Sequence, residues 1–208
     1  MDQINYEKPA LPTPCWICKR GTVYPYHEER DPEVVGCCNN LDCGFRIKGQ
    51  DQLTGLRNRA FVDNELPRIL GTAVDEGTNL EVGLLDIDHF KLVNDNHGLH
   101  VADKVLVQLA QLLSEAAAPD SLAARTGGEE FLLVLTGDHI PERFEALRKR
   151  VESHPWERIA SGLKVTVSTG ATRLRPGRQT QAALLGQAQR FLHAAKSAGR
   201  NRVVLDPD

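Results

Sequence analysis

The stretch "AARTGGEEFLLVL", residues 123–135, places two glycines and two glutamates inside an otherwise apolar, strand-like run. Glycine pairs between apolar runs are ordinary turn residues, so residues 121–126 and 130–135 are predicted to be the two strands of a hairpin. Taken alone, the pattern is most often a turn whose acids face water. Whether these four residues, Gly127, Gly128, Glu129 and Glu130, do more than turn the chain depends on the residues around them.

Predicted strands and helices alternate on either side of this hairpin. The predicted helices are residues 99–117, 140–154 and 181–199, and the predicted strands are residues 79–88, 164–174 and 202–205. The helices follow from apolar residues at helical spacing. The strand at residues 79–88 is an apolar run that ends in acids, and residues 164–174 alternate with a period of two. This order predicts an α/β (α+β) fold, a mixed sheet with helices packed on it.

Composition limits the functional classes. The chain has 208 residues, of which 41% are hydrophobic and 25% charged, as in ordinary globular proteins. A formal net charge of −3 argues against an indiscriminate nucleic-acid binder, so nucleic acid is an unexpected partner. The start of the chain has no basic-then-apolar signal sequence, and no apolar run approaches the roughly 20 residues that span a bilayer. We therefore expect a cytoplasmic protein with no membrane partner.

The cysteines are confined to the start of the chain. All five, Cys15, Cys18, Cys37, Cys38 and Cys43, precede residue 44. A C-x2-C pair (Cys15, Cys18) and a C-x4-C pair (Cys38, Cys43) can each present two thiolates to one ion, which indicates a tetrahedral zinc site. Cys37 is the alternative to Cys38 as a ligand. An iron centre and a set of reduced thiols are the alternatives to zinc.

The confinement of the cysteines indicates a domain boundary. A piece of about 30 residues buries too little apolar surface to fold alone, so a bound metal would stabilise it. Its spacing resembles that of the zinc-ribbon family, with two short strands in residues 21–36. The expected organisation is a tail at residues 1–14, a zinc-ribbon-like four-cysteine β module at residues 15–48, and a second domain at residues 51–205.

Acidic residues follow the buried strand of the second domain. Asp86 and Asp88 are two apart, so they are expected to project from one face at the strand's end, where carboxylates are costly unless they meet a cation or donors. Lys91 follows within one turn. Lys196 and Arg200 are candidate phosphate anchors, although either could be surface charge. Together with the bare glycine turn, these residues indicate a Mg²⁺–nucleotide site for phosphoryl or nucleotidyl transfer.

The same residues carry a family resemblance. Five motifs occur in order: "DQLTGLRNR" at 51–59, "DIDHFKLVND" at 86–95, "ADKVL" at 102–106, "RTGGEEF" at 125–131 and "AAKSAGRN" at 194–201. The domain resembles the GGDEF family of diguanylate cyclases, bacterial signalling enzymes, in its GGEEF variant. The resemblance implies a palm-like βαββαβ sheet with flanking helices. It also implies a transferase that condenses two GTP into cyclic di-GMP and two pyrophosphates as a homodimer, because each domain holds one GTP.

The resemblance also implies roles for individual residues. Asp86, the carbonyl of Ile87 and Glu129 match the ligands of two Mg²⁺ or Mn²⁺ ions at each GTP site. Glu129 would also help to deprotonate the attacking 3′-hydroxyl, and Glu130 would assist at the metal site. The remaining matches are to GTP: Gly127, Gly128, Lys91, Lys196, Arg200 and the amides of His89 and Phe90 for the phosphates, and Asn94 and Asp103 for guanine. The cysteine module is then the expected regulator or dimerisation element.

The sequence departs from the family pattern in one place that matters. Family members that are inhibited by their product carry an Arg-x-x-Asp motif shortly before the glycine turn, and Ala118 and Ser121 stand at its two ends here. We therefore predict no inhibition through that site. The alternative function, a catalytically idle scaffold that binds GTP or cyclic di-GMP, would be indicated by loss of the glycines, glutamates or Asp86, and all of these are present.

Overall fold

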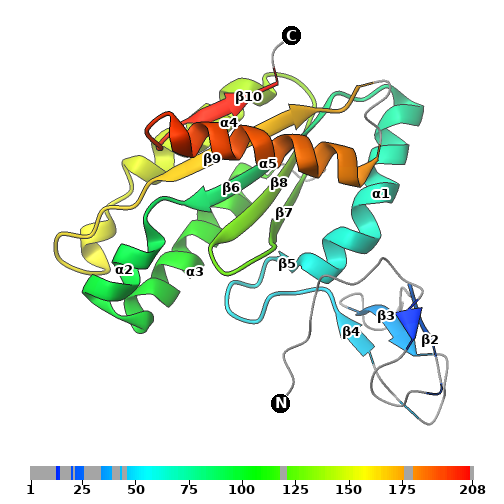
Figure 1. The fold of residues 1–208 in the computed structure, drawn as a ribbon, viewed down its shortest axis with the longest axis horizontal. Coiled ribbons are helices and arrows are strands. Elements are labelled where there is room, and N and C mark those ends of the chain that lie inside the picture. The colour runs from blue at the N-terminus through cyan, green and yellow to red at the C-terminus, as the bar shows by residue number, and fades with distance from the viewer. Residues whose placement is uncertain are drawn as a thin grey trace.

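The chain forms two sheets, a small one near the N-terminus and a larger one flanked by helices on both faces (Figure 1). This computed structural model describes residues 13–14, 20, 22–25, 34–38, 43, 46–117, 121–175 and 180–206. The small sheet has the order β1 (Thr13–Pro14), β2 (Thr22–Pro25), β3 (Val34–Cys38) and β4 (Arg46–Lys48), and all neighbours are antiparallel. The two strands predicted within residues 21–36 are thereby confirmed. Thr13 and Pro14, the last residues of the expected tail, are part of the sheet.

The larger sheet is mixed and has six strands in the order β10-β9-β6-β8-β7-β5. Its strands are β5 (Arg57–Asn58), β6 (Leu80–Ile87), β7 (Leu122–Arg125), β8 (Glu130–Thr136), β9 (Val167–Arg173) and β10 (Val203–Leu205). β6 lies at the centre and is antiparallel to both β8 and β9. β7 and β8 form the predicted antiparallel hairpin around the glycine turn. The predicted mixed sheet is therefore confirmed.

Helices cover both faces of this sheet. They are α1 (Arg59–Glu76), α2 (Phe90–His97), α3 (Leu99–Ala116), α4 (Ile140–Glu152) and α5 (Gln181–Ser197), with a short 3-10 helix η1 (Trp156–Arg158). The order β6, α2 and α3, β7, β8, α4, β9 is the expected βαββαβ arrangement. Among the described residues, no helix is long and apolar enough to cross a bilayer.

Two helices and one burial pattern differ from the sequence expectation. α1 and α2 were not predicted. α1 contains Pro67 and buries the charged residue Glu65, both of which obscure a helical apolar period. α2 is only 8 residues long. β9 was expected to alternate, but six of its seven residues are buried because helices cover both of its faces.

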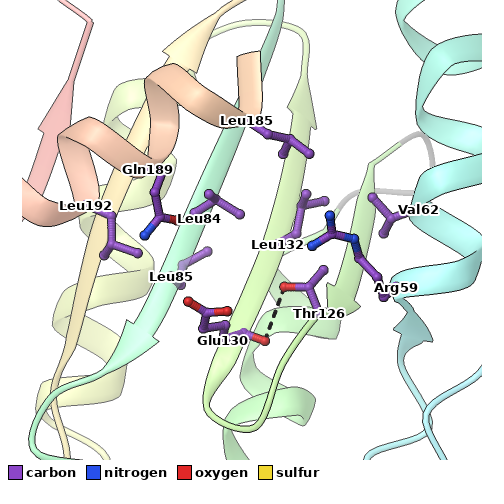
Figure 2. A pocket seen from close by; sticks show the side chains of 10 residues that line it. All are labelled: Arg59, Val62, Leu84, Leu85, Thr126, Glu130, Leu132, Leu185, Gln189 and Leu192. Atoms are coloured by element: carbon purple, nitrogen blue, oxygen red, sulfur yellow. Dashed lines mark hydrogen bonds between the residues drawn. The ribbon is translucent and has the colours of Figure 1, made fainter. Parts of the chain in front are cut away.

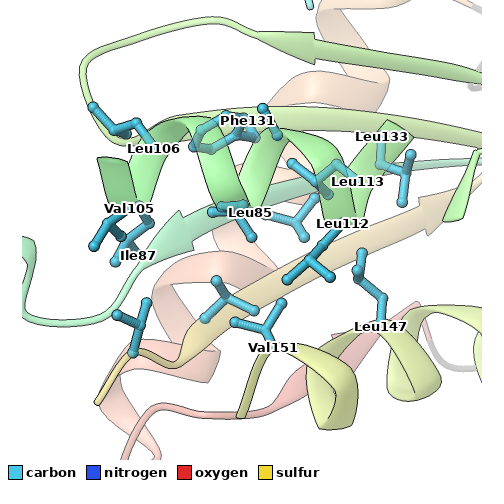
Figure 3. Packing of buried hydrophobic residues seen from close by; sticks show 14 of the residues in the cluster. Leu85, Ile87, Val105, Leu106, Leu112, Leu113, Phe131, Leu133, Leu147 and Val151 are labelled. Carbon is cyan, nitrogen blue, oxygen red and sulfur yellow. The ribbon is translucent and has the colours of Figure 1, made fainter. Parts of the chain in front are cut away.

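Alternate residues of the central strands feed two apolar cores. Leu85, Ile87, Phe131 and Leu133 face α3 and α4, where side chains such as Leu113 complete the larger core (Figure 3). The side chains on the other face of these strands pack against α1 and α5; they are Leu80, Val82, Leu132 and Val134. This period-two division is what a sheet covered on both faces requires.

Helix α5 lies unusually close to the sheet. A Cβ atom at Gly170 in β9 would come within 2.0 Å of the Leu192 backbone nitrogen and 2.3 Å of the Ala188 carbonyl oxygen. No side chain fits there, so glycine allows the backbone of α5 to rest directly on β9. This contact directs the C-terminal end of α5, which carries Lys196, toward the end of β6.

The small sheet joins the larger domain without a long linker. β3 and β4 contact α1. The Asn58 backbone nitrogen donates to the Gly49 carbonyl at 2.9 Å, and its side-chain amide donates to the Gln50 carbonyl at 3.1 Å. Of the predicted metal ligands, Cys15, Cys18 and the side chain of Cys38 lie outside the described residues. Cys37 and Cys43 are half-buried, and neither forms a disulfide.

Candidate active site

The end of β6 meets the glycine turn of the hairpin. In the sheet register Asp86 lies opposite Glu130 on β8 and opposite Ser168 on β9. The Ile87 backbone nitrogen donates to the Glu129 carbonyl at 3.3 Å. Asp86, Ile87 and Glu129, which are distant in sequence, are therefore neighbours, as their predicted common role requires.

Negative charge is concentrated at this point. Burial raises the pKa of Asp86, and its charged neighbours Glu130 and Asp88 add to the rise. Burial, and then the charge of Asp86, raise the pKa of Glu129 as well. The Lys196 ammonium lies 2.8 Å from Asp86 Oδ1 and opposes the shift in both groups. A cluster of this kind favours the binding of a cation, and its oxygen donors are those that Mg²⁺ and Mn²⁺ prefer.

Asp88 has a different environment from Asp86, although the sequence spacing made the two alike. Its Oδ1 accepts from Ser168 Oγ at 2.6 Å, and its Oδ2 accepts from Thr166 Oγ1 at 2.7 Å. Oδ2 also accepts from the Asn201 backbone nitrogen at 3.0 Å. These bonds tie three segments of the chain together. Asp88 is therefore a structural anchor, whose buried carboxylate is compensated by hydrogen-bond donors.

The glycine turn exposes bare backbone. Its closing bonds run from the Thr126 and Gly127 backbone nitrogens to the Glu130 carbonyl, at 3.0 and 3.3 Å. Neither glycine has a left-handed φ, and a Cβ atom added to Gly128 would meet nothing within 4 Å. Backbone conformation and packing within the chain therefore do not explain why Gly128 lacks a side chain. Glycine at this position leaves the space beside the turn open.

An ion pair that the sequence did not assign holds this turn. Arg125 donates to the Gly128 carbonyl at 2.7 Å through Nη2, and to Asp51 Oδ1 at 3.1 Å through Nη1. Asp51 also accepts from the Thr54 backbone and hydroxyl, at 2.9 and 2.6 Å. Asp51 and Arg125 each begin one of the family motifs in the sequence, and this position was the only indication in the sequence that they have a role at the site. Their contact depends on the parallel pairing of β5 with β7.

The predicted phosphate contacts surround the end of β6. His89, with φ of 55°, turns the chain directly from β6 into α2, whose first residues are Phe90 and Lys91. Lys91 is exposed and Phe90 is buried. Arg200 is half-buried just after α5, with φ of 64°. The start of α2 thus presents free backbone N–H groups to this region, as an anion site requires.

The predicted guanine contacts lie on the other side of the strand end. Asn94 is half-buried on α2, and Asp103 is exposed on α3, two helices that pack against each other. Both helices cover the face of the sheet opposite α5. The structure thus places the candidate base contacts and the candidate Lys196 contact on opposite faces of the sheet.

A cavity of about 230 Å³ lies beside the site, between α1 and α5 (Figure 2). Its lining residues are Arg59, Val62, Leu84, Leu85, Thr126, Glu130, Leu132, Leu185, Gln189 and Leu192. Glu130 is the one predicted site residue among them. Asn94 and Asp103, on α2 and α3, lie on the opposite face of the sheet from this cavity.

Comparison with known proteins connects this geometry to one family. The family model described as "Diguanylate cyclase, GGDEF domain" matches residues 48–202. The chain is 34% identical over 172 residues to the response regulator PleD of Caulobacter vibrioides, a match that covers 80% of the chain and 38% of PleD. It is 37% identical over 166 residues to the probable diguanylate cyclase DgcT of Escherichia coli, covering 76% of the chain and 36% of DgcT. The chain thus spans less than two fifths of these relatives.

Solved structures agree with the fold. The GGDEF domain of DgcB from Caulobacter crescentus, in complex with c-di-GMP, superimposes with a TM-score of 0.69 at 36% identity. That match covers 76% of this chain and 92% of the other. The active GGEEF domain of a diguanylate cyclase from Vibrio cholerae superimposes with a TM-score of 0.68 at 29% identity, covering 74% and 99% of the two chains.

Proposed function

The chain belongs to the GGDEF family, and from that premise we propose that it is a diguanylate cyclase, which condenses two GTP into cyclic di-GMP and two pyrophosphates. One observation carries the proposal: Asp86, Glu129 and Lys196 meet at the end of β6, beside a turn whose backbone is open to a ligand. This juxtaposition supports a site for a polyphosphate with its divalent cation.

The metal ligands in this proposal are the Asp86 and Glu129 carboxylates and the Ile87 carbonyl. Their oxygen atoms suit Mg²⁺ or Mn²⁺, and the raised pKa values of both acids indicate charge that a cation would relieve. The bound ions would neutralise the phosphate charge and polarise the reacting phosphoryl group. Glu130, opposite Asp86 in the register, shapes the site from the neighbouring strand.

The protein's own groups bind and orient GTP. Lys91, Lys196 and Arg200 pair with phosphate oxygens, and the N–H groups of His89 and Phe90 donate to them at the start of α2. The backbone of Gly127 and Gly128 follows the phosphates closely. Asn94 and Asp103 hold guanine, since a carboxylate accepts from its N1–H and N2–H₂ groups, which adenine lacks on that edge.

The reaction joins nucleotides held by two chains. Each chain supplies one site, so we propose a homodimer in which the two sites face each other. The 3′-oxygen of one GTP forms a bond to the α-phosphorus of the other while the bond to the pyrophosphate oxygen breaks. Glu129 takes the hydroxyl proton. Repetition in the opposite sense closes the ring, and the contribution of the protein is mainly positioning and charge neutralisation.

The N-terminal module completes the proposal. We propose that Cys15, Cys18, Cys38 and Cys43 bind one Zn²⁺ and that the module regulates the domain or holds two copies together. Cys37 remains the alternative to Cys38. Metal analysis of the purified chain tests this: about one zinc per chain is expected, and less than about half an equivalent with every thiol accessible would argue against the site.

The central experiment is incubation of the purified chain with GTP and Mg²⁺, followed by chromatography for cyclic di-GMP. Glu129→Gln keeps the size of the side chain but removes its charge, and we expect it to lower the rate by at least about a hundredfold. Arg150→Ala, on the exposed side of α4, is the matched control and should keep the wild-type rate. A well-folded dimer that binds GTP but makes no product would instead identify a nucleotide-binding scaffold.

A further inference from the structure

The segment that follows α5 has an unusual backbone. Three consecutive residues, Gly199, Arg200 and Asn201, have left-handed φ values of 109°, 64° and 45°. Residues other than glycine adopt this conformation at a cost, so surrounding contacts must hold it in place. The segment carries Arg200, which the proposed function assigns to a GTP phosphate.

Backbone contacts fix the two ends of this segment. The Arg200 nitrogen donates to the Ala195 carbonyl at 3.0 Å, and the Asn201 nitrogen donates to Asp88 Oδ2 at 3.0 Å. Asp88 is itself buried and held by hydroxyls of Thr166 and Ser168. Asp88 therefore ties Asn201 to the strand that ends at the candidate active site.

Two residues of helix α4 form hydrogen bonds with the side chain of Asn201. Arg148 Nη1 donates to Asn201 Oδ1 at 2.9 Å, and Asn201 Nδ2 donates to Glu152 Oε1 at 2.7 Å. The Arg148 side chain is only 11% exposed, and it also pairs with Glu152 and Glu145, each at 2.8 Å. These hydrogen bonds from Arg148 lower the pKa of both carboxyls, so the cluster is charged at neutral pH. A planar guanidinium with this many partners has little freedom to turn.

Helix α4 is anchored in the main core by Phe144, Leu147 and Val151, which lie beside Arg148 on the helix surface. Arg148 is therefore presented by a rigid element. Since Asn201 adjoins Arg200, fixing the Asn201 side chain and backbone also fixes the direction in which the chain presents Arg200.

We infer that Arg148, together with Glu152, is a positioning residue that holds Arg200 for contact with the GTP phosphates. This inference rests on the proposed function. It assigns to α4, which carries none of the family's motif residues, a part in nucleotide binding.

The test measures the affinity of the full chain for GTP and for guanosine by calorimetry. Arg148→Ala should weaken GTP binding by about tenfold and leave guanosine binding unchanged, because only the phosphate contact is misplaced. Asn201→Gly should do the same, and it favours the left-handed φ, so it guards against a failure to fold. Arg150 lies on α4 as Arg148 does, but it pairs with Glu115 of α3, so Arg150→Ala is the matched control and should bind GTP normally.

A double-variant cycle separates the possible outcomes. In an Arg200→Ala background, Arg148→Ala should weaken GTP binding by less than about twofold, because its effect passes through Arg200. Loss of GTP affinity in Arg200→Ala but not in Arg148→Ala would overturn the positioning role alone. Equal loss of GTP and guanosine affinity in Arg148→Ala would overturn it too. Unchanged GTP affinity in Arg200→Ala would overturn the phosphate assignment and this inference together, whereas cyclase activity is judged separately by product formation.

Discussion

Gly128 illustrates how a missing side chain can reflect a ligand. It has no left-handed φ, and a Cβ atom there would meet open space. At Gly127 the same atom would lie 2.8 Å from a carboxylate oxygen of Glu130 and 3.3 Å from the Cβ atom of Glu130. Packing within the chain therefore disfavours a side chain at Gly127 but leaves room for one at Gly128.

Gly128→Ala is therefore expected to separate stability from binding. The free energy of unfolding should stay within about 0.5 kcal/mol of the wild-type value, because nothing is displaced. GTP affinity should fall, because the added methyl group occupies the space proposed for phosphate. Urea unfolding and calorimetric titration with GTP check the two parts, and a large loss of stability would contradict the explanation.

Asp51 stabilises the fold through its charge. Partial burial acts to raise its pKa, but the hydrogen bonds from Thr54 and Arg125 outweigh burial and hold the pKa below the ordinary value of 3.8. A carboxyl with a depressed pKa in the folded state adds stability above its unfolded pKa. That contribution disappears as the pH falls through the lower, folded value.

Asp51→Asn keeps an acceptor for Thr54 but removes the ion pair with Arg125. We expect it to lower the free energy of unfolding by about 1–2 kcal/mol at pH 7. The gap between wild type and variant should close as the pH falls below about 4, because the wild-type carboxyl then becomes protonated. Urea unfolding at several pH values measures this gap. A gap that stays constant down to pH 2 would mean that the charge of Asp51 contributes nothing.

At the scale of elements, the close packing of α5 against β9 determines where Lys196 lies. The contact at Gly170 is backbone against backbone, with no flexible side chain that could yield. A shift of α5 away from the sheet would also carry Lys196 away from Asp86, which lies 2.8 Å from it.

Gly170→Ala is accordingly expected to cost about 3 kcal/mol or more of stability, because α5 must move to admit the methyl group. Gly186→Ala is the matched control, since it lies on α5 itself and its added Cβ meets nothing within 4 Å. Better helix propensity should make that variant about 0.5–1 kcal/mol more stable. Thermal unfolding of both variants tests the contrast, and similar stability of the two would refute the close-contact argument.

At the scale of the whole molecule, the small sheet joins the larger domain close to the candidate active site. β4 is followed by Gly49, Gln50 and then Asp51. Asp51 pairs with Arg125, and Arg125 also donates a hydrogen bond to the Gly128 carbonyl. The contacts of Asp51 and Arg125 therefore connect the end of β4 to the glycine turn, and no helix lies between β4 and β5.

The sequence predicts that the product, cyclic di-GMP, does not inhibit this protein through the Arg-x-x-Asp site. Ala118 and Ser121 replace the Arg-x-x-Asp ends, and the Ser121 hydroxyl is buried without a hydrogen-bond partner among the described residues. Added cyclic di-GMP should therefore leave the initial rate of pyrophosphate release unchanged when GTP is saturating. Ala118→Arg with Ser121→Asp is the matched test of restored inhibition. Strong inhibition of the wild type that a change at Ser121 abolishes would contradict the prediction.

The sequence by itself determined the elements and much of the site. Apolar periodicity and glycine turns are local signals, so the central strand, the hairpin and three helices could be predicted from them. The motifs also marked Asp86, Glu129 and Lys196, which the structure brings together. α1 and α2 were missed because an internal proline, a buried charge and short length weaken those same local signals.

Only the tertiary structure decided which partners residues with similar sequence positions have. Asp86 and Asp88 are alike in spacing, yet Lys196 pairs with the first, and the second is bound by Thr166, Ser168 and Asn201. The Asp51–Arg125 ion pair and the hold of Arg148 on Asn201 likewise join residues far apart in the chain. The physical reason is that strand register and helix packing set these contacts, and both depend on the assembled cores rather than on any local pattern.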